Sequence, residues 1–500
     1  MLLVRGGQIL APSGSALEQA DVFIDGDRIV AVGPALEGPA DAPRLDARGQ
    51  IVLPGLINAH THAHNNLTKG LGDNWTLEDL LNHGPALQVG RTPEEQYLSA
   101  VLGAVEMLET GCTAAFDMFS ALPAPTVEGV EAVVQAYTDV GLRGVLAPMV
   151  GDLVFYRVLP GLLDLLPPDL RRRAESLEAA PAAGLLQLAE DAVRRWDGAA
   201  SGRIRMGVAP TIPGHCSDAL LVGCARLARE HGVSLQTHLA ESKVQAVAGL
   251  RRWGKTITQA LAAAGMLGPR FVGGHAVWLT PEDIHLLADA GAAVAHNPAS
   301  NLKLGSGIAP VREMLDAGVV VGLGTDGSMS SDNQNLFEAM RVAGLVNKVR
   351  FGHEQDRWIG ARAVWGMATE GSARCLGLAD DVGAVAPGRQ ADLVLLRGDS
   401  VFLRPLNDAV NALVYAETGA DVTTVLVAGR VLVEQGRIVT VDAARLRARA
   451  QDAVDRLRAQ NAAAWALAEQ LGPYVATACR AAVTTPYPVN RYATPIAASA

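Results

Sequence analysis

Residues 51–62, IVLPGLINAHTH, join a run of apolar residues to two histidines separated by one position. Alternation along a β-strand places residues i and i+2 on the same side, so the imidazoles of His60 and His62 can point the same way. Seven further apolar runs follow, at residues 112–119, 142–150, 204–212, 233–241, 270–278, 292–300 and 319–326. Each is nearly continuous in apolar residues, as expected of a strand buried on both faces.

Stretches able to form helices separate these eight runs. Eight repeats of a strand followed by a helix predict an α/β fold of the (β/α)8 TIM-barrel type. Short strands are also expected in the first 50 residues and again at residues 391–398 and 422–439. We therefore expect a small β-sandwich domain built from both chain ends, residues 1–54 and 381–440, beside a metal-binding barrel over residues 55–380.

The C-terminal part, residues 441–500, has a composition of its own. The segment from Ala443 to Gln470 is rich in Ala, Arg, Leu and Gln and predicts one long helix. The Pro-containing tail from Pro473 onward is expected to be irregular. Neither segment has a place in the chemistry, so we expect them to pack on a second subunit of a homodimer or larger assembly.

Composition excludes several classes of partner. Charged residues make up 19% of the 500 residues and the net charge is -10, which argues against nucleic acid, because phosphate binding needs clustered Lys and Arg. The five cysteines are scattered, which argues against a disulfide framework and favours reduced thiols in the cytoplasm. The N-terminus does not resemble a secretory signal, and no apolar stretch is long enough to predict a membrane span.

Polar groups stand where several of the predicted strands end. In a barrel of this kind the active site lies at the C-terminal ends of the strands. A lone histidine there is more often a hydrogen-bonded core or rim residue than a ligand, so the indication of a metal site lies in the ordered combination. The six groups are His60, His62, His238, Glu241, His275 and Asp326.

The chemistry of this set suits a transition metal. Three imidazoles and a carboxylate favour Zn²⁺, or Fe²⁺ as the alternative, over Ca²⁺ and Mg²⁺. Such an ion activates water near neutral pH, Asp326 can accept a proton from that water, and Glu241 can reach both water and substrate. No lysine ends an early strand to bridge two metals, so one ion per chain is expected. His296 and Asn297 are expected to position Asp326 or the loop after it.

Five motifs carry a family resemblance. They are PGLINAHTHAH (54–64), QTHLAE (236–241), GGHAVWL (273–279), AHNPASNLKLGSGIAPV (295–311) and GLGTDGSMSSDNQNLFEAMR (322–341). Together they resemble the amidohydrolase superfamily over residues 1–440, in its mononuclear branch of S-adenosylhomocysteine/methylthioadenosine deaminases, triazine hydrolases and guanine-type deaminases. The resemblance implies that Glu241 is a proton shuttle and that His275 holds the hydrolytic water or the substrate. It also implies metal ligation by His60, His62, His238 and Asp326.

The resemblance to the adenosyl deaminases is incomplete at the substrate. These enzymes carry a substrate-binding Glu after the first strand, where Trp75 and Glu78 lie here. They also carry a His after the fourth strand, where this chain has Thr211, and an Arg after the third, where the stretch Leu146–Met149 has none. The groups that would hold a nucleoside's ribose or charged tail are therefore missing, and S-adenosylhomocysteine is not the expected substrate.

Other residues near the strand ends are candidates for substrate contact. His215 follows the fourth strand and could touch substrate. Aromatic rings after strands one, two, three and six could sandwich a flat ring, or could simply pack the rim of the barrel. These aromatic residues are Trp75, Phe119, Phe155, Tyr156 and Trp278.

Together these features predict a metal-dependent hydrolase that attacks a C–N bond with metal-activated water. The first expectation is deamination of a small, uncharged or weakly charged, amino-substituted nitrogen heterocycle. Hydrolysis of an open-chain amide, urea or carbamate is the alternative, and a non-catalytic metal-binding barrel is a further one. A structural metal site needs closed ligands but no proton shuttle, so Glu241 favours the enzyme.

Overall fold

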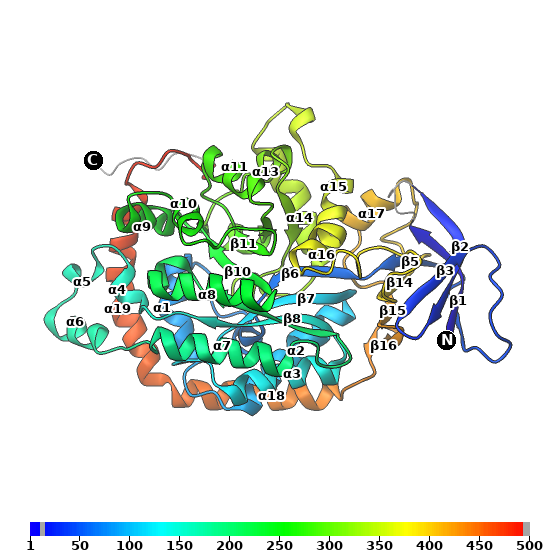
Figure 1. The fold of residues 1–500 in the computed structure, drawn as a ribbon, viewed down its shortest axis with the longest axis horizontal. Coiled ribbons are helices and arrows are strands. Elements are labelled where there is room, and N and C mark those ends of the chain that lie inside the picture. The colour runs from blue at the N-terminus through cyan, green and yellow to red at the C-terminus, as the bar shows by residue number, and fades with distance from the viewer. Residues whose placement is uncertain (11–15, 494–500) are drawn as a thin grey trace.

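The barrel predicted from the eight apolar runs is confirmed in the computed structural model, which describes residues 1–10 and 16–493 (Figure 1). Eight parallel strands lie side by side in chain order, one in each run. They are β6 (Leu56–Thr61), β7 (Cys112–Phe119), β8 (Arg143–Val150), β9 (Ile204–Pro210), β10 (Ser234–Leu239), β11 (Phe271–His275), β12 (Ala293–His296) and β13 (Val320–Leu323). Every residue of these strands is buried except Met149 and Val320, which are partly buried, and Arg205, which is exposed. Such burial is expected of strands that are covered on both faces.

The barrel closes between its first and last strands at the end that carries the polar residues. A parallel bridge joins Thr61 to Asp326, and the Asp326 N–H donates to the His60 carbonyl at 2.9 Å. Closure therefore fixes the backbone of His60 beside that of Asp326, although the two are far apart in sequence.

Helices cover the outside of the barrel. Strand β6 is followed by α1 (Leu77–His83) and α2 (Pro93–Glu109), β7 by α3 (Val127–Val140), and β8 by α4 (Phe155–Val158), α5 (Leu162–Leu165), α6 (Pro168–Glu175) and α7 (Ala182–Trp196). Strand β9 is followed by α8 (Asp218–His231), β10 by α9 (Lys243–Trp253) and α10 (Ile257–Ala263), and β11 by α11 (Pro281–Asp289). Strand β12 is followed by α12 (Pro298–Lys303) and α13 (Val311–Asp316), and β13 by α14 (Leu336–Val349), α15 (Ala361–Gly366) and α16 (Ser372–Cys375). Many of them begin at a Ser, Thr or Asn whose side chain accepts a backbone N–H of the first turn, as at Thr92 and Ser242.

A β-sheet built from both chain ends, separate from the barrel, is also confirmed. Its strands form one mixed sheet in the order β17-β16-β15-β14-β5-β1-β2-β3, with β4 paired to β1. They are β1 (Leu2–Leu10), β2 (Leu17–Asp25), β3 (Arg28–Gly33), β4 (Arg44–Asp46), β5 (Gln50–Pro54), β14 (Leu393–Arg397), β15 (Val422–Val427), β16 (Arg430–Glu434) and β17 (Arg437–Ile438), with α17 (Ala409–Tyr415) between β14 and β15. The ion pair of Arg143 with Asp392 is buried where the barrel meets this sheet, with Nε 2.8 Å from Oδ2.

The first apolar run is divided between the two sheets at Gly55. Residues before it, in β5, pair with β1 and β14, whereas residues after it, in β6, pair with β7. A side chain at Gly55 would place Cβ 1.9 Å from Thr113 Oγ1, so only glycine fits where the chain passes from sheet to barrel.

The C-terminal part differs from the expected single helix and irregular tail. Two helices form, α18 (Ala443–Gln460) and α19 (Ala462–Val483), which meet at Asn461, and α19 continues through Pro473. An interior proline costs a helix about 3 kcal/mol. Here the buried stripe of Ala468, Leu471, Val475, Ala478, Cys479 and Ala482 keeps helical spacing on both sides of Pro473, and its packing outweighs that cost.

Both C-terminal helices pack on their own barrel. α18 lies against α2, and α19 lies against α1, α5 and α9 (Figure 1). The buried face of each helix is thus covered within the chain itself. All five cysteines are buried and unpaired. Among the helices of the described residues, none has the length and apolar character needed to cross a membrane.

Candidate active site

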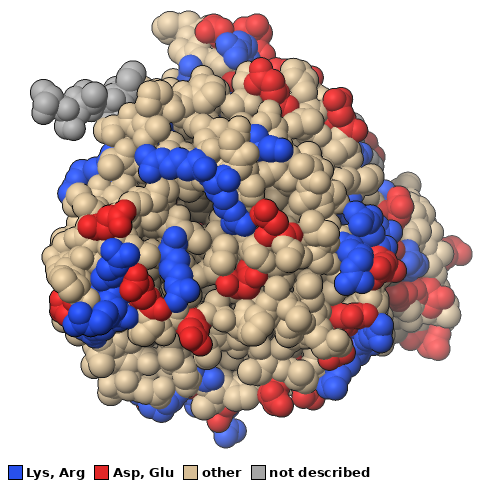
Figure 2. Space-filling model, turned by 60° about the vertical axis from the view of Figure 1, so that its left-hand side comes forward, with Lys and Arg blue, Asp and Glu red and all other residues tan. Residues whose placement is uncertain are grey.

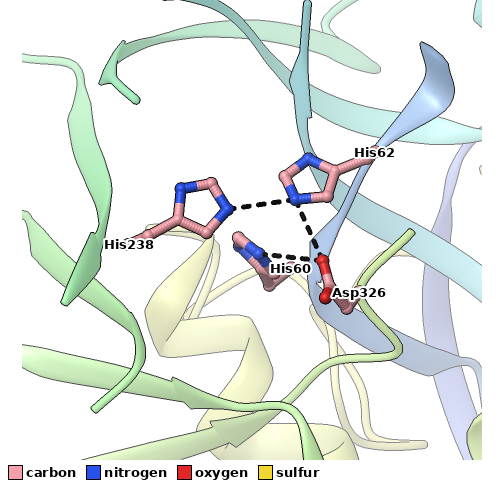
Figure 3. A group of neighbouring side chains, drawn as sticks. All are labelled: His60, His62, His238 and Asp326. Carbon is pink, nitrogen blue, oxygen red and sulfur yellow. Dashed lines mark hydrogen bonds and ion pairs between the residues drawn. The ribbon is translucent and has the colours of Figure 1, made fainter. Parts of the chain in front are cut away.

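Four of the predicted metal ligands converge at one point inside the closed end of the barrel (Figure 3). The His62 Nε2 atom lies 2.9 Å from Asp326 Oδ1 and 3.1 Å from His238 Nε2, and His60 Nε2 lies 3.4 Å from the same carboxylate oxygen. All four side chains are buried. Two ligand atoms about 2.1 Å from one tetrahedral ion stand roughly 3.4 Å apart, so the cluster has the dimensions of a single-ion site.

Hydrogen bonds on the outer side of each imidazole fix which nitrogen faces the cluster. The Nδ1 atoms of His62 and His238 donate to the carbonyls of Met118 and Thr211, both at 2.6 Å. The Nδ1 atom of His60 donates to Gln236 Oε1 at 2.7 Å, because the amide nitrogen of Gln236 is engaged with a carbonyl. In the neutral form of each ring, Nε2 therefore turns an unprotonated lone pair inward, which is the form that ligates a metal.

Two serines hold Asp326 from behind. Ser300 Oγ and Ser330 Oγ each donate to Asp326 Oδ2 at 2.6 Å, which leaves Oδ1 for the cluster. His296 and Asn297, the residues expected to position Asp326, have no hydrogen-bond partner for their side chains within the described residues. Asn297 instead packs against the strand before Asp326, where a Cβ on Gly324 would meet its Oδ1 at 2.3 Å.

Glu241 and His275 lie at the edge of the same cluster, with Glu241 Oε1 3.7 Å from His275 Nδ1. His275 Nδ1 is hydrogen-bonded to Asn301 Oδ1 at 2.9 Å. Glu241 Oε2 and His275 Nε2 are buried and have no partner in the described part of the chain. Backbone φ is positive at His275 (66°) and Asp326 (61°), a conformation that non-glycine residues rarely adopt and that is concentrated at functional sites.

Burial and neighbouring charges shift the pKa values of the two carboxyl groups of the site in opposite directions. Burial raises the pKa of Glu241 well above its usual range, and the carboxylates of Asp326 and Glu78 add to the effect. Burial alone would also raise the pKa of Asp326, but its contacts with His60 and His62 hold that pKa well below the usual range. A carboxylic acid beside a carboxylate is the arrangement expected of a proton donor beside a metal ligand.

The residues present fit a divalent ion. The lone pairs of His62 and His238 face each other at 3.1 Å, and His60 Nε2 has no hydrogen-bond partner among the described residues. Neutral imidazoles held this way repel one another unless a cation lies between them. The pKa of His60 is lowered by burial, and that of His238 lies well below its usual value for the same reason, so both favour the metal-binding form.

A cavity of about 370 Å³ lies beside the segment that carries Glu241, although none of the cluster residues lines it. Glu78 and Gln245 line it, and both contact the segment that carries Glu241. Glu78 accepts a hydrogen bond from Ser242 at 2.6 Å, and Gln245 accepts one from the Glu241 N–H at 2.9 Å. Most of the remaining wall is apolar, with Leu153, Phe155, Ile212, Val244, Trp253 and Ile257.

The substrate-contact candidates occupy different places. His215 lines the cavity beside Phe155, and burial lowers its pKa to about 4, so its imidazole is neutral at neutral pH. Thr211 contributes its carbonyl to His238, and its hydroxyl lies 3.5 Å from Met149 Sδ. Trp75 stacks on His83, with ring centroids 4.9 Å apart.

The remaining aromatic candidates are packed inside the protein. Trp278 is fully buried and donates from Nε1 to the Ser306 carbonyl at 2.8 Å. Phe119 is buried in the main core, and the Tyr156 hydroxyl donates to Asn82 at 2.9 Å. Of the aromatic side chains predicted to flank a ring, Phe155 is the one that lines the cavity.

Comparisons with known proteins agree with this geometry. The model of the amidohydrolase family matches residues 51–432. A 5-methylthioadenosine/S-adenosylhomocysteine deaminase of Thermococcus kodakarensis is 36% identical over 433 residues, covering 86% of this chain and 93% of the relative. A 5'-deoxyadenosine deaminase of Methanosarcina mazei is 32% identical over 462 residues, covering 92% and 99%.

Solved structures show the same architecture. An atrazine chlorohydrolase of Arthrobacter aurescens TC1 in complex with zinc superposes with a TM-score of 0.82 at 31% identity, covering 91% of this chain and all of the other. An adenosine deaminase of Xanthomonas campestris with bound zinc gives 0.80 at 26% identity, covering 92% and 98%. With the family model spanning most of the barrel and the metal-binding set assembled at its closed end, this chain belongs to the amidohydrolase family.

Proposed function

We propose that this protein deaminates an amino-substituted nitrogen heterocycle. It binds one divalent ion, Zn²⁺ in preference to Fe²⁺, through His60, His62, His238 and Asp326. The observation that carries the proposal is the buried carboxyl group of Glu241, whose Oε2 has no hydrogen-bond partner among the described residues, beside a cluster of metal-ligating atoms. A purely structural metal site has no use for such a group, because its ligands are already complete.

The chemistry follows from the positions of the side chains. A divalent ion in this site would make water nucleophilic near neutral pH. With the ion bound, Asp326 would accept the proton that the water loses as it attacks the ring carbon, and the protonated Glu241 would deliver its proton to the departing amino nitrogen, so that the C–N bond breaks and ammonia leaves. His275 directs its free Nε2 toward the reacting atoms, and Asn301 holds the ring in that orientation.

The cavity supports a small substrate without a strong charge. Its volume of about 370 Å³ is at the lower end of the usual range for small-molecule sites. Of its three arginines, Arg252 is paired with Asp218, Arg157 donates to the carbonyls of Glu175 and Leu177, and Arg251 lies 3.5 Å from the Thr485 hydroxyl. Acidic and basic side chains are mixed over the face shown in Figure 2, which gives a polyanion no continuous basic surface.

Ammonia release from a substrate panel tests the proposal. The panel contains 5'-deoxyadenosine, 5'-methylthioadenosine, guanine, a pyrimidine amine, a triazine amine, and an open-chain amide and aryl urea. Glu241→Gln keeps the size of the side chain but cannot shuttle protons, so turnover should fall by at least ~100-fold while bound metal stays near one ion per chain. Glu131→Gln, on the exposed face of α3, is the matched control.

Three outcomes would count against the proposal. Normal turnover by Glu241→Gln would exclude the carboxyl group as the shuttle. Ammonia release from the amide or urea alone would replace ring deamination with the open-chain alternative, and no turnover of any compound by the metal-loaded protein would favour a binding role.

A further inference from the structure

The segment that follows α19 forms a strap across the loops at the catalytic end of the barrel. This C-terminal strap, residues 484–493, passes α9 and α10 at the red end of the chain in Figure 1. Its backbone is fixed where the Ile308 N–H donates to the Arg491 carbonyl at 2.9 Å. The neighbouring Gly307 has φ of +121°, and a Cβ there would lie 2.9 Å from the Arg491 carbonyl oxygen, so the approach depends on glycine.

Two strap side chains bind consecutive carbonyls in the loop after β11. The Tyr487 hydroxyl donates to the Trp278 carbonyl at 3.2 Å, and Arg491 Nη2 donates to the Leu279 carbonyl. The Trp278 ring also meets the rings of Tyr487 and Tyr492 edge-on, at centroid distances of 6.0 and 4.9 Å. The strap therefore holds both the backbone and the side chain of this loop.

The loop that the strap holds is joined to the loop that carries Glu241. The backbone N–H of Trp278 donates to the Ala240 carbonyl at 2.8 Å, and the backbone N–H of Ala276 donates to the Leu239 carbonyl at 3.0 Å. Ala240 directly precedes Glu241, and His275 directly precedes Ala276. The two reactive side chains thus stand on two loops that are hydrogen-bonded to each other.

These loops adopt a strained backbone. φ is positive at Ala240 (46°), His275 (66°) and Ala276 (51°), and none of the three is a glycine. Residues in this region keep their conformation only where surrounding contacts determine it. The strap supplies such contacts from outside the barrel, two and three residues beyond the strained Ala276.

We propose that Tyr487 and Arg491 are positioning residues for catalysis. They hold residues 239–241 and 275–279 in the conformation that brings the Glu241 carboxyl group and the His275 imidazole close to Asp326. The assignment rests on the proposed function for the roles of Glu241 and His275, whereas the contacts of the strap stand independently of it.

Activity measurements on the full-length, metal-loaded enzyme test the proposal. Arg491→Ala should lower kcat at least tenfold and Tyr487→Phe about threefold, with KM and bound metal within twofold of wild type, because the metal ligands stay in place. Arg491→Lys, or guanidinium added to Arg491→Ala, should restore part of kcat. Arg480→Ala is the control, since Arg480 is an exposed residue of α19 that bonds Thr477 on the same helix.

Amide hydrogen exchange gives a readout independent of turnover. Peptides containing residues 239–241 and 275–279 should exchange faster in Arg491→Ala and Tyr487→Phe than in wild type and in Arg480→Ala. Wild-type kcat and exchange in both variants would overturn the proposal. So would a loss of activity that matches the loss of metal or of folded protein. If the wild type releases no ammonia from any panel compound, the proposed function fails, while exchange still decides whether the strap holds these loops.

Discussion

Removing the hydroxyl group of Ser300 is expected to weaken metal binding although Ser300 is not itself a ligand. Its Oγ donates to Asp326 Oδ2 at 2.6 Å and is fully buried, so bulk water cannot replace it. A hydrogen bond to a charged group contributes about 1.5–3 kcal/mol. By the relation of tenfold per about 1.4 kcal/mol, Ser300→Ala should weaken the affinity for Zn²⁺ by roughly 10- to 100-fold.

The second serine, Ser330, allows the effects of the two hydroxyl groups on Zn²⁺ affinity to be ranked. Ser330 Oγ is 2.6 Å from Asp326 Oδ2 and also 2.9 Å from the Gly327 carbonyl, so its single hydrogen is shared. Ser330→Ala should therefore weaken binding less than Ser300→Ala. The double variant should lose less than the product of the two effects, because both hydroxyls act on one oxygen.

Titration of the metal-free protein with Zn²⁺ against a competing chelator measures these affinities. Ser331→Ala is the control, because Ser331 lies on the same loop and donates to the carbonyls of Gly327 and Asn333 but not to Asp326. Affinity of Ser300→Ala within threefold of wild type would refute the reasoning that the hydroxyl orients the carboxylate.

Three further predictions concern the ligands, the substrate and the fold. His238→Ala should lose the metal in elemental analysis, whereas His275→Asn should retain about one ion per chain and lose turnover; two tightly bound ions in wild type would contradict the single-ion site. For S-adenosylhomocysteine, kcat/KM should fall below about 10⁴ M⁻¹s⁻¹, and a higher value would indicate that another cation, such as Arg251 at the cavity, binds its charged tail. Arg143→Met leaves the buried Asp392 without its cation and should lower the free energy of unfolding by about 3–5 kcal/mol, seen as a lower urea midpoint; an unchanged midpoint would show that the pair contributes nothing.

The barrel could be predicted because its strands carry an unusually clear signal. A parallel strand covered on both faces is a continuous apolar run, and eight such runs spaced by helix lengths leave few alternatives. The cluster could be predicted for a related reason. His60, His62, His238 and Asp326 interrupt apolar runs at their ends, where an unsatisfied polar group would be costly without a function.

The contacts that orient the cluster could not be predicted in the same way. Serine is common in loops, and nothing in residues 298–335 marks Ser300 and Ser330 as the hydroxyls that reach Asp326 until α12 and the loop after β13 are placed. The continuation of α19 was missed because Pro473 suggested a break. The apolar spacing of Leu471, Val475 and Ala478 carried the opposite signal, and tertiary packing decided between them.

The central place of β5 in the small sheet has a consequence for synthesis of the protein. Strand β5 lies between β1, made before it, and β14, which leaves the ribosome only after the whole barrel. Until then one edge of the apolar stretch Ile51–Val52–Leu53 offers unpaired backbone groups, the type of edge that recruits strands from other chains. Release of the nascent chain before residue 393 would therefore leave an aggregation-prone strand at the base of a barrel that is otherwise complete, so a strand made in the last fifth or so of translation protects a strand made in the first fifth.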